Sequence, residues 1–217
     1  MPDRGLKSLT KPYGYFSFKS METGLILASR SQRRQELLAQ VGIVYRIVEA
    51  DIEENLPEDL PTQEAVIRLA RDKAAWVEAK YPDNWILAAD TVVALGDVIF
   101  QKPRDELDAI AMLQRLSGRS HEVFTGYCLR HRALNKTREG VARTVVTMKQ
   151  LTPREIEGYV KTGEPLDKAG AYAIQGIGAM FIEKIYGSYT NVVGLPLAEV
   201  VTLLMEEGAA SPWEGKL

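Results

Sequence analysis

The sequence has little of what several classes of protein require. Its 217 residues include one cysteine and two histidines. Cys128 therefore has no internal disulfide partner, and a zinc site is not expected, because zinc takes mainly Cys and His ligands. The longest apolar run, residues 85–95, contains Asp90 and is far shorter than the roughly 20 residues of a membrane span. We expect a reduced, cytoplasmic protein with a buried thiol and no membrane contact.

Positive charge is not in excess either. The 27 Lys and Arg residues against 29 Asp and Glu give a net charge of −2, which argues against bulk binding of nucleic acid. The chain also lacks internal repeats, low-complexity tracts and the G-x-x-x-x-G-K-[ST] phosphate loop, so a phosphotransferase of that kind is not indicated. The expected partner is a small molecule, and any local basic cluster is of interest.

The chain is long enough to bury a substantial core, with 46% hydrophobic residues. Residues 1–23 are polar and aperiodic, which is typical of a flexible N-terminal extension. A single domain is expected over residues 24–207, followed by a C-terminal tail at 208–217. Glu58 and Asp59 are expected only to solvate a loop.

Strand and helix patterns alternate from Leu25 onward. The alternation predicts an α/β or α+β domain with a mixed, twisted sheet flanked by helices. The helix starting at 152 has a capping box with proline at its first position, and residues 187–196 are expected to be a turn. Strands are predicted at 25–28, 43–48, 85–95, 98–100, 121–131, 141–149 and 180–185, and helices at 33–41, 62–81, 105–116, from 152 and at 196–205.

The passage from the first strand to the first helix is typical of an anion site. The strand ends at Ser29, the hydroxyl of Ser31 is expected to cap the helix, and Arg33 and Arg34 follow in its first turn. A helix N-terminus favours a phosphate, and guanidiniums bind phosphates with charge-assisted hydrogen bonds. Taken alone, this pattern is more often a capped helix with two solvated arginines.

Asp90 is a carboxylate inside an apolar strand. An ionised group there is costly unless a cation pairs with it. A metal ion and a buried lysine are the two alternatives. Asp51, Glu53 and Glu54 follow the second predicted strand, and an all-oxygen donor set favours Mg²⁺ or Mn²⁺.

Two lysines and a glycine-containing segment complete the chemistry-bearing residues. Lys73 interrupts an apolar helix face, where it either snorkels to solvent or serves the site. Lys102 follows a hairpin strand and is able to reach a phosphate or to lie in a surface turn. Gly170 and Gly176 are expected to allow close approach of a flat ligand, and Gln175 offers a donor and an acceptor to a base edge. The alternative for this segment is an ordinary packed loop.

These motifs together resemble the Maf family of nucleoside triphosphate pyrophosphatases, which are related in fold to the inosine triphosphate pyrophosphatases. The resemblance runs from Leu25 to Leu204, in order, and covers these segments: 27–38 (LASRSQRRQELL), 89–91 (ADT), 101–104 (QKPR), 167–172 (DKAGAY), 174–176 (IQG) and 187–196 (GSYTNVVGLP).

The resemblance implies a two-lobed catalytic domain with a cleft, a homodimer, and cleavage of a nucleoside triphosphate between the α and β phosphates with Mg²⁺ or Mn²⁺. It implies a catalytic role for Asp90, Glu54, Lys73 and Lys102, with Asp90 as base or metal-bound carboxylate. Glu54 and Asp90 are the implied metal ligands. Ser29 and Arg33 are the implied phosphate-binding residues.

Base preference within the family is associated with the positions of Arg34, Thr91 and Gln175, which here are similar to the branch acting on dTTP, UTP and modified relatives. A glutamine amide is able to pair with the O4 and N3–H edge of uracil or thymine. Arg30 and Gln32 depart from the family pattern, which usually has a small residue and a proline there. The alternative function is a nucleotide-binding regulator of cell division or septum formation that binds without turnover.

Overall fold

The computed structural model describes residues 24–57 and 60–212. The expected extension 1–23, the loop residues Glu58 and Asp59, and residues 213–217 of the expected tail lie outside the described residues. The strands are β1 (Leu25–Leu27), β2 (Arg46–Ile47), β3 (Trp85–Leu95), β4 (Val98–Phe100), β5 (Ser120–His131), β6 (Lys136–Met148) and β7 (Ile182–Tyr186). The α-helices are α1 (Gln32–Gln40), α2 (Thr62–Glu78), α3 (Glu106–Leu116), α4 (Pro153–Val160), α5 (Tyr189–Val193) and α6 (Leu197–Glu206), and the 3-10 helices are η1 (Glu164–Asp167), η2 (Ala169–Ala171) and η3 (Ile177–Phe181).

Within the described residues the strands form one mixed sheet. Its order is β2-β1-β3-β5-β6-β7, with β4 paired to the end of β3. β1 runs parallel to β2 and β3, whereas β3, β5, β6 and β7 pair antiparallel along the sheet. The predicted fold class, a mixed sheet flanked by helices, is confirmed.

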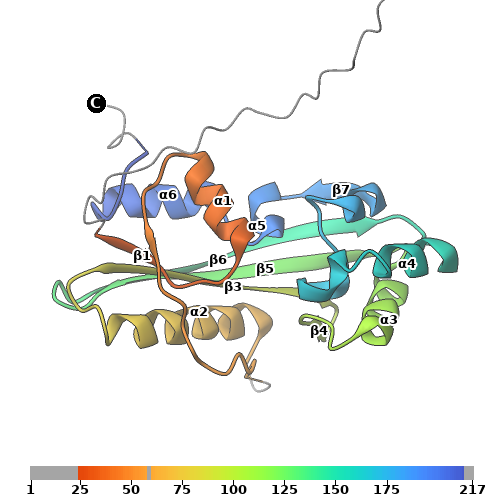
Figure 1. Ribbon diagram of the computed structural model, residues 1–217, viewed down its shortest axis with the longest axis horizontal. Helices are drawn as coiled ribbons and strands as arrows, with labels where there is room; N and C mark the ends of the chain where they lie inside the picture. Colours follow the sequence, from red (N-terminus) through yellow and green to blue (C-terminus); the bar gives the residue numbers. More distant parts are fainter. Residues whose placement is uncertain (1–23, 58–59, 213–217) are drawn as a thin grey trace, which may run out of the picture.

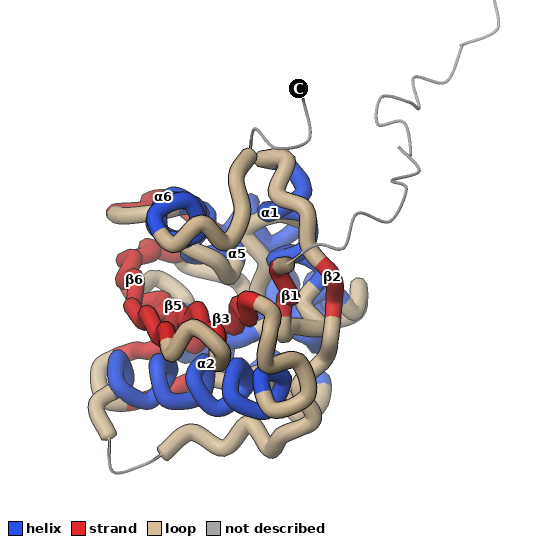
Figure 2. The backbone as a smooth tube through the Cα atoms, turned by 90° about the vertical axis from the view of Figure 1, so that its left-hand side faces the viewer, coloured by secondary structure: helices blue, strands red, loops and turns tan. Residues whose placement is uncertain are grey.

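Helices cover both faces of the sheet (Figure 2), with α2 on one face and α1 and α6 on the other. Neighbouring residues of a strand point to opposite faces, and the buried strand residues divide accordingly. Ile26, Ala28, Ile86, Ala88 and Cys128 pack with Ala70, Ala74 and Val77 of α2, and Leu25, Leu27, Leu87, Ala89 and Leu129 pack with Leu37, Leu38, Val200 and Leu204 of α1 and α6. The buried Cys128 is confirmed as a core thiol, and burial raises its pKa to about 12.

A third hydrophobic cluster lies at the other end of the long strands, around α3, α4 and the 3-10 helices (Figure 1). It includes Val93 and Phe100 from the β3–β4 hairpin, Leu113 of α3, Tyr159 of α4 and Phe181 of η3. The strands β3, β5 and β6 run from the end covered by α1, α2 and α6 to the end covered by α3 and α4. They therefore connect the two ends in one continuous sheet. No helix in 24–57 or 60–212 combines the length and hydropathy that crossing a bilayer would need.

Several expected elements differ from those observed. The strand predicted at 43–48 is only Arg46–Ile47, because the N–H of Ile43 bonds Leu38 O at the end of α1 and its side chain packs in the α1–α6 cluster. β6 begins at Lys136 rather than 141, since β5 supplies ladder partners along the whole hairpin. The expected turn at 187–196 contains α5, which is capped by Ser188. The capping box of Thr152 and Glu155 is confirmed.

Candidate functional site

The nine residues to which the resemblance gives a catalytic, binding or specificity role line one cleft of about 980 Å³. One wall consists of the β1–α1 turn, the loop before α2, the middle of β3 and the end of α5, which Arg33 and Arg34 contact. The other consists of residues 101–102 and 164–176, which are joined by the Gly170 N to Gln101 O hydrogen bond. The cleft therefore lies between the cluster around α1 and α6 and the cluster around α3 and α4. The residues brought together are Ser29, Arg33, Arg34, Glu54, Lys73, Asp90, Thr91, Lys102 and Gln175.

Ser29 and Ser31 differ in the contacts that their hydroxyls make in the β1–α1 turn. Ser31 is the N-cap residue of α1, but its side chain makes no capping hydrogen bond, so the expected hydroxyl cap is wrong. Ser29 Oγ instead accepts two hydrogen bonds, from the backbone N–H of Ser31 at 3.2 Å and from Arg34 Nη1 at 3.2 Å. Both lone pairs of the Ser29 hydroxyl are then in use, and its O–H remains as a donor toward the cleft.

The two adjacent arginines have different environments. Arg34 is buried, and its guanidinium donates to Gly194 O at 2.7 Å, Ser29 Oγ at 3.2 Å and Thr91 Oγ1 at 2.9 Å. Burial lowers the pKa of Arg34, an effect that the nearby Asp90 carboxylate opposes. Arg33 is partly exposed, donates from Nε to Val193 O at 3.3 Å and lies 3.5 Å from Asp167. Arg33 is the arginine with donors available to a ligand.

Thr91 belongs to a chain of hydrogen bonds inside the protein. Its hydroxyl lies 2.9 Å from Thr125 Oγ1, which donates to Asn191 O at 3.2 Å. Thr91 accepts from Arg34, and its own proton has two acceptors within reach, Thr125 Oγ1 and, at 3.4 Å, Gly194 O. Arg34 and Thr91 therefore form one rigid part of the cleft wall, connected to α5.

Lys73 joins the two predicted acidic residues. Its Nζ lies 2.5 Å from Asp90 Oδ1 and 2.8 Å from Glu54 Oε1. Lys73 and Asp90 are 6% and 8% exposed, so Lys73 does not extend to solvent, and it is the buried cation that Asp90 needs. Burial alone would raise the pKa of Glu54, but Lys73, Lys102 and Arg34 outweigh burial and lower it.

The carboxylates fit a metal that arrives with a phosphate ligand. Among residues 24–57 and 60–212, no three His, Cys, Asp or Glu side chains converge as a ready metal cluster. Mg²⁺, however, is usually held by one or two protein carboxylates together with substrate phosphates and water. Glu54 and Asp90, which meet at the Lys73 ammonium, provide such a donor set.

Lys102 and Gln175, the remaining predicted site residues, lie on the opposite side. Lys102 is exposed at the cleft, and the preceding Gln101 bonds Glu54 O through Nε2 at 3.3 Å and Gly170 N through its carbonyl at 3.1 Å. The amide of Gln175 lines the cleft and has no hydrogen-bond partner among the described residues. Arg30 lies at the rim and pairs with Glu49 at 2.9 Å.

The glycines of this wall do not act as expected. A Cβ on Gly170 would lie 2.9 Å from Val93 Cγ2, and a Cβ on Gly176 would lie 2.3 Å from Glu164 Oε2. Both glycines make room for the protein's own side chains rather than for a flat ligand. The interpretation as a packed loop describes this segment better, with Tyr172 buried and bonded through its hydroxyl to His121.

Sequence reasoning assigned no role to several residues of the cleft. Lys168 Nζ lies 2.5 Å from Asp167 Oδ1 and donates to Glu164 O at 2.8 Å, and Asp167 in turn lies beside Arg33. The charged pair 167–168 in front of a glycine-containing segment was the available signal. The backbone carbonyl of Gly194, which accepts from Arg34, carries no such signal in the sequence.

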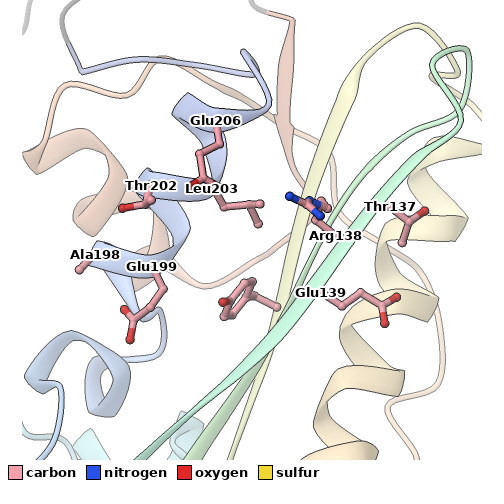
Figure 3. Close-up of a pocket in the computed structure, with 9 residues that line it drawn as sticks. Thr137, Arg138, Glu139, Ala198, Glu199, Thr202, Leu203 and Glu206 are labelled. Carbon is pink, nitrogen blue, oxygen red and sulfur yellow. The ribbon is translucent and has the colours of Figure 1, made fainter.

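A second cavity of about 620 Å³ lies between β6 and α6 and contains none of the predicted site residues (Figure 3). Glu199 and Glu206 line it from α6, and Arg138 and Glu139 line it from β6. The guanidinium of Arg138 is paired with Glu207 at 2.7 Å, and Glu139 is paired with Arg71. With its cation already paired and its acids in excess, this cavity is poorly suited to a phosphate.

Known proteins resemble this chain over almost its whole described length. A protein named dTTP/UTP pyrophosphatase from Anaeromyxobacter dehalogenans is 50% identical over 196 residues, which is 89% of this chain and 99% of that protein. Proteins of the same name from Myxococcus xanthus and Geobacter sulfurreducens are each 50% identical, covering 88% and 87% of this chain and 96% and 100% of their own lengths.

Among solved structures, the Ham1 protein of Staphylococcus aureus matches 57% of this chain and 71% of its own at 13% identity and a TM-score of 0.35. The family described as Maf-like protein matches residues 24–207. With that match across the cleft-bearing domain, this chain belongs to the Maf-like protein family.

Proposed function

We propose that this protein hydrolyses dTTP and UTP, and modified pyrimidine relatives, to the nucleoside monophosphate and pyrophosphate. One observation carries the proposal: Asp90 and Glu54 converge on buried Lys73 in the same cleft as Arg33, Lys102 and the Ser29 hydroxyl. Relatives half identical to this chain have the name dTTP/UTP pyrophosphatase. The activity discards nucleotides, including modified ones, from the triphosphate pool.

The triphosphate binds along the β1–α1 turn. The free O–H of Ser29 donates to a phosphate oxygen, and Arg33 and Lys102 supply positive charge on either side. Because Ser29 already accepts from Ser31 N and Arg34, its donor direction is set before the substrate arrives. Such preorganised donors stabilise the charge that develops at phosphorus.

Hydrolysis proceeds by attack of water on the α-phosphorus. The bond between the α-phosphorus and the bridging oxygen breaks, and pyrophosphate carries away the electron pair. The Asp90 carboxylate orients the water and accepts its proton. Glu54 and Asp90 hold Mg²⁺ or Mn²⁺, which when bound offsets the charge of the phosphates. Lys73 holds both carboxylates in place through its ion pairs with Asp90 and Glu54.

Base preference comes from the opposite wall. The unpartnered Gln175 amide pairs with O4 and N3–H of uracil or thymine. Arg34 and Thr91 shape the wall that faces Gln175 through their bonds to each other and to Gly194, so their influence on base choice is exerted through position. The residue that contacts the base edge is Gln175.

A panel of canonical and modified nucleoside triphosphates tests the proposal. Each is incubated with Mg²⁺ or Mn²⁺, with and without a chelator, while monophosphate and pyrophosphate are quantified. Release of pyrophosphate from dTTP and UTP, lost on chelation, is expected. Failure with every pyrimidine nucleotide would contradict the substrate assignment, and turnover unaffected by chelation would contradict the metal.

A regulator of cell division that binds nucleotide without turnover is the alternative, and it predicts binding of UTP with no pyrophosphate released.

We also propose that the protein forms a homodimer, as the family resemblance implies. From the resemblance together with the single cysteine, we propose a cytoplasmic location. Light scattering on the purified chain tests the first, because a monomeric mass at micromolar concentration would contradict it. Cell fractionation tests the second.

A further inference from the structure

The segment Ala173–Gly178 has to hold Gln175 in place, yet it is irregular up to the start of η3. Ala173, Ile174, Gln175 and Gly176 line the cleft. A side chain on a loop discriminates between bases only if the loop backbone is held within a fraction of an ångström. The supports of this backbone therefore bear on base choice, which rests on the function proposed above.

Glu164 holds one end of the segment. Its Oε2 accepts from Ile177 N at 2.9 Å, and its Oε1 accepts from Gly178 N at 3.0 Å. These are N–H groups at the start of η3, where helical hydrogen bonding leaves donors without partners. A carboxylate at this position binds them strongly because the bonds are charge-assisted.

Tyr159 of α4 holds the other end. Its hydroxyl donates to Glu164 Oε1 at 2.8 Å and accepts from Ala173 N at 3.0 Å. Both ends of Ala173–Gly178 are thus bound to one pair of side chains in contact with each other. The ring of Tyr159 is buried against Phe181, which gives the pair a rigid base.

The glycines of the segment fit the same arrangement. A Cβ on Gly176 would lie 2.3 Å from Glu164 Oε2, and a Cβ on Gly178 would lie 2.6 Å from the Tyr159 hydroxyl. The backbone therefore packs directly on the two polar groups. Burial would raise the pKa of Glu164, but the N–H donors of Gly178 and Ile177, the Tyr159 hydroxyl and the Lys168 ammonium together outweigh it and lower the pKa, so the carboxylate stays ionised at neutral pH.

We propose that Glu164 is a positioning residue for base selection, holding the Ala173–Gly178 segment, together with Tyr159, so that Gln175 meets the edge of the pyrimidine. Glu164 acts on the backbone of the segment, not on the reacting phosphate. Its loss is expected to reduce discrimination between bases much more than the rate of hydrolysis.

The test compares kcat and KM for UTP and CTP in Glu164→Gln, Gln175→Ala and the double variant. CTP has an amino group and an unprotonated N3 where uracil has O4 and N3–H, so it reports on pairing with Gln175. In Glu164→Gln one carboxylate oxygen is replaced by an amide NH₂, which cannot accept from the N–H of Ile177 or Gly178. At least one of these backbone bonds is therefore lost. The preference for UTP over CTP is expected to fall about tenfold, mainly through KM, with kcat for UTP within about threefold. The double variant is expected to lose no more preference than Gln175→Ala alone.

Glu155→Gln is the matched control, because Glu155 is also a carboxylate that accepts backbone and side-chain donors but lies at the start of α4, outside the cleft. It should leave the preference unchanged. Tyr159→Phe keeps the carboxylate and releases Ala173 N, so it should give a smaller loss in the same direction even if Glu164→Gln folds poorly. Equal losses for UTP and CTP, or fully additive effects of Glu164→Gln and Gln175→Ala, would overturn the proposal.

If the wild-type protein released no pyrophosphate from UTP, the proposed function would fail, and calorimetric binding of UTP and CTP would replace kinetics. Stronger binding of UTP that is lost in Glu164→Gln would then still support the positioning role. Equal binding of the two nucleotides by the wild type would overturn it.

Discussion

The ammonium of Lys73 lies 2.5 Å from Oδ1 of Asp90, and both side chains are buried. An isolated charge at either position would be costly, so each residue explains the presence of the other on an otherwise apolar helix face or strand. Glu54 joins the pair from an adjacent loop at 2.8 Å and is about half exposed. The buried pair is therefore open to the cleft on its Glu54 side.

Loss of Lys73 is expected to be expensive for folding. Lys73→Met leaves the Asp90 carboxylate buried without its cation and should lower the free energy of unfolding by about 3 kcal/mol. Urea unfolding monitored by circular dichroism measures the change. Lys136→Met removes an exposed lysine from Glu207, which keeps Arg138, and should cost less than about 1 kcal/mol. Equal losses in the two variants would contradict this account.

Asp90→Asn should separate catalysis from folding. The amide keeps the size of the side chain and leaves Lys73 paired with Glu54, while the proton acceptor is lost. We expect kcat for UTP to fall by about 10² to 10⁴-fold, with the far-UV spectrum and urea midpoint close to wild type. Wild-type turnover in the purified variant would refute the role of Asp90.

Arg34→Lys should impair substrate binding although the charge is kept. A lysine ammonium lacks the planar fork that reaches Gly194 O, Ser29 and Thr91 together. We expect KM for UTP to rise about tenfold and the effect to be non-additive with Thr91→Val, since the two side chains share a hydrogen bond. Steady-state kinetics measure both. Arg68→Lys, on the exposed face of α2, is the control and should change neither kcat nor KM.

Gly126 is expected to be intolerant of a methyl group. A Cβ there would lie 2.4 Å from the backbone of Val66 in α2, so Gly126→Ala forces the helix off the sheet and should destabilise the fold by about 1–3 kcal/mol. Gly158→Ala is the opposite case, because a Cβ on Gly158 in α4 would have nothing within 4 Å. This substitution should raise the free energy of unfolding by about 0.5–1 kcal/mol. Thermal unfolding measures both, and a neutral Gly126→Ala would contradict the close packing.

Mild acid should destabilise the protein through His121. Burial lowers the pKa of His121 to about 4, below the roughly 6.5 of an unfolded histidine. Between these values the unfolded chain binds the extra proton, so stability is full above pH 6.5 and falls, by up to about 3 kcal/mol, as the pH drops toward 4. Urea unfolding across this range measures it. His121→Gln, which keeps a partner for Tyr172, should lose that part of the pH dependence, and an unchanged slope would contradict the assignment.

Local patterns in the sequence determined most elements of the fold. The apolar run Trp85–Leu95, the Thr152–Glu155 capping box and the amphipathic α2 were predicted close to their observed bounds. These signals depend on neighbours within a few residues, so periodicity and capping chemistry suffice. Strands were predicted at β2 and β6 but with the wrong bounds, and α5 was not predicted, because each depends on pairing or packing with distant residues.

The candidate site divides in the same way. The sequence by itself identified the chemistry-bearing residues, since a carboxylate in a strand and a lysine on an apolar helix face each interrupt an apolar pattern that is visible in the sequence. Only the tertiary structure decided their partners: Lys73 with Asp90, Arg34 with Gly194, and Glu164 with the backbone of 177–178. Partners separated by up to 160 residues meet through the packing of the whole sheet, and a backbone carbonyl or N–H leaves no mark in the sequence.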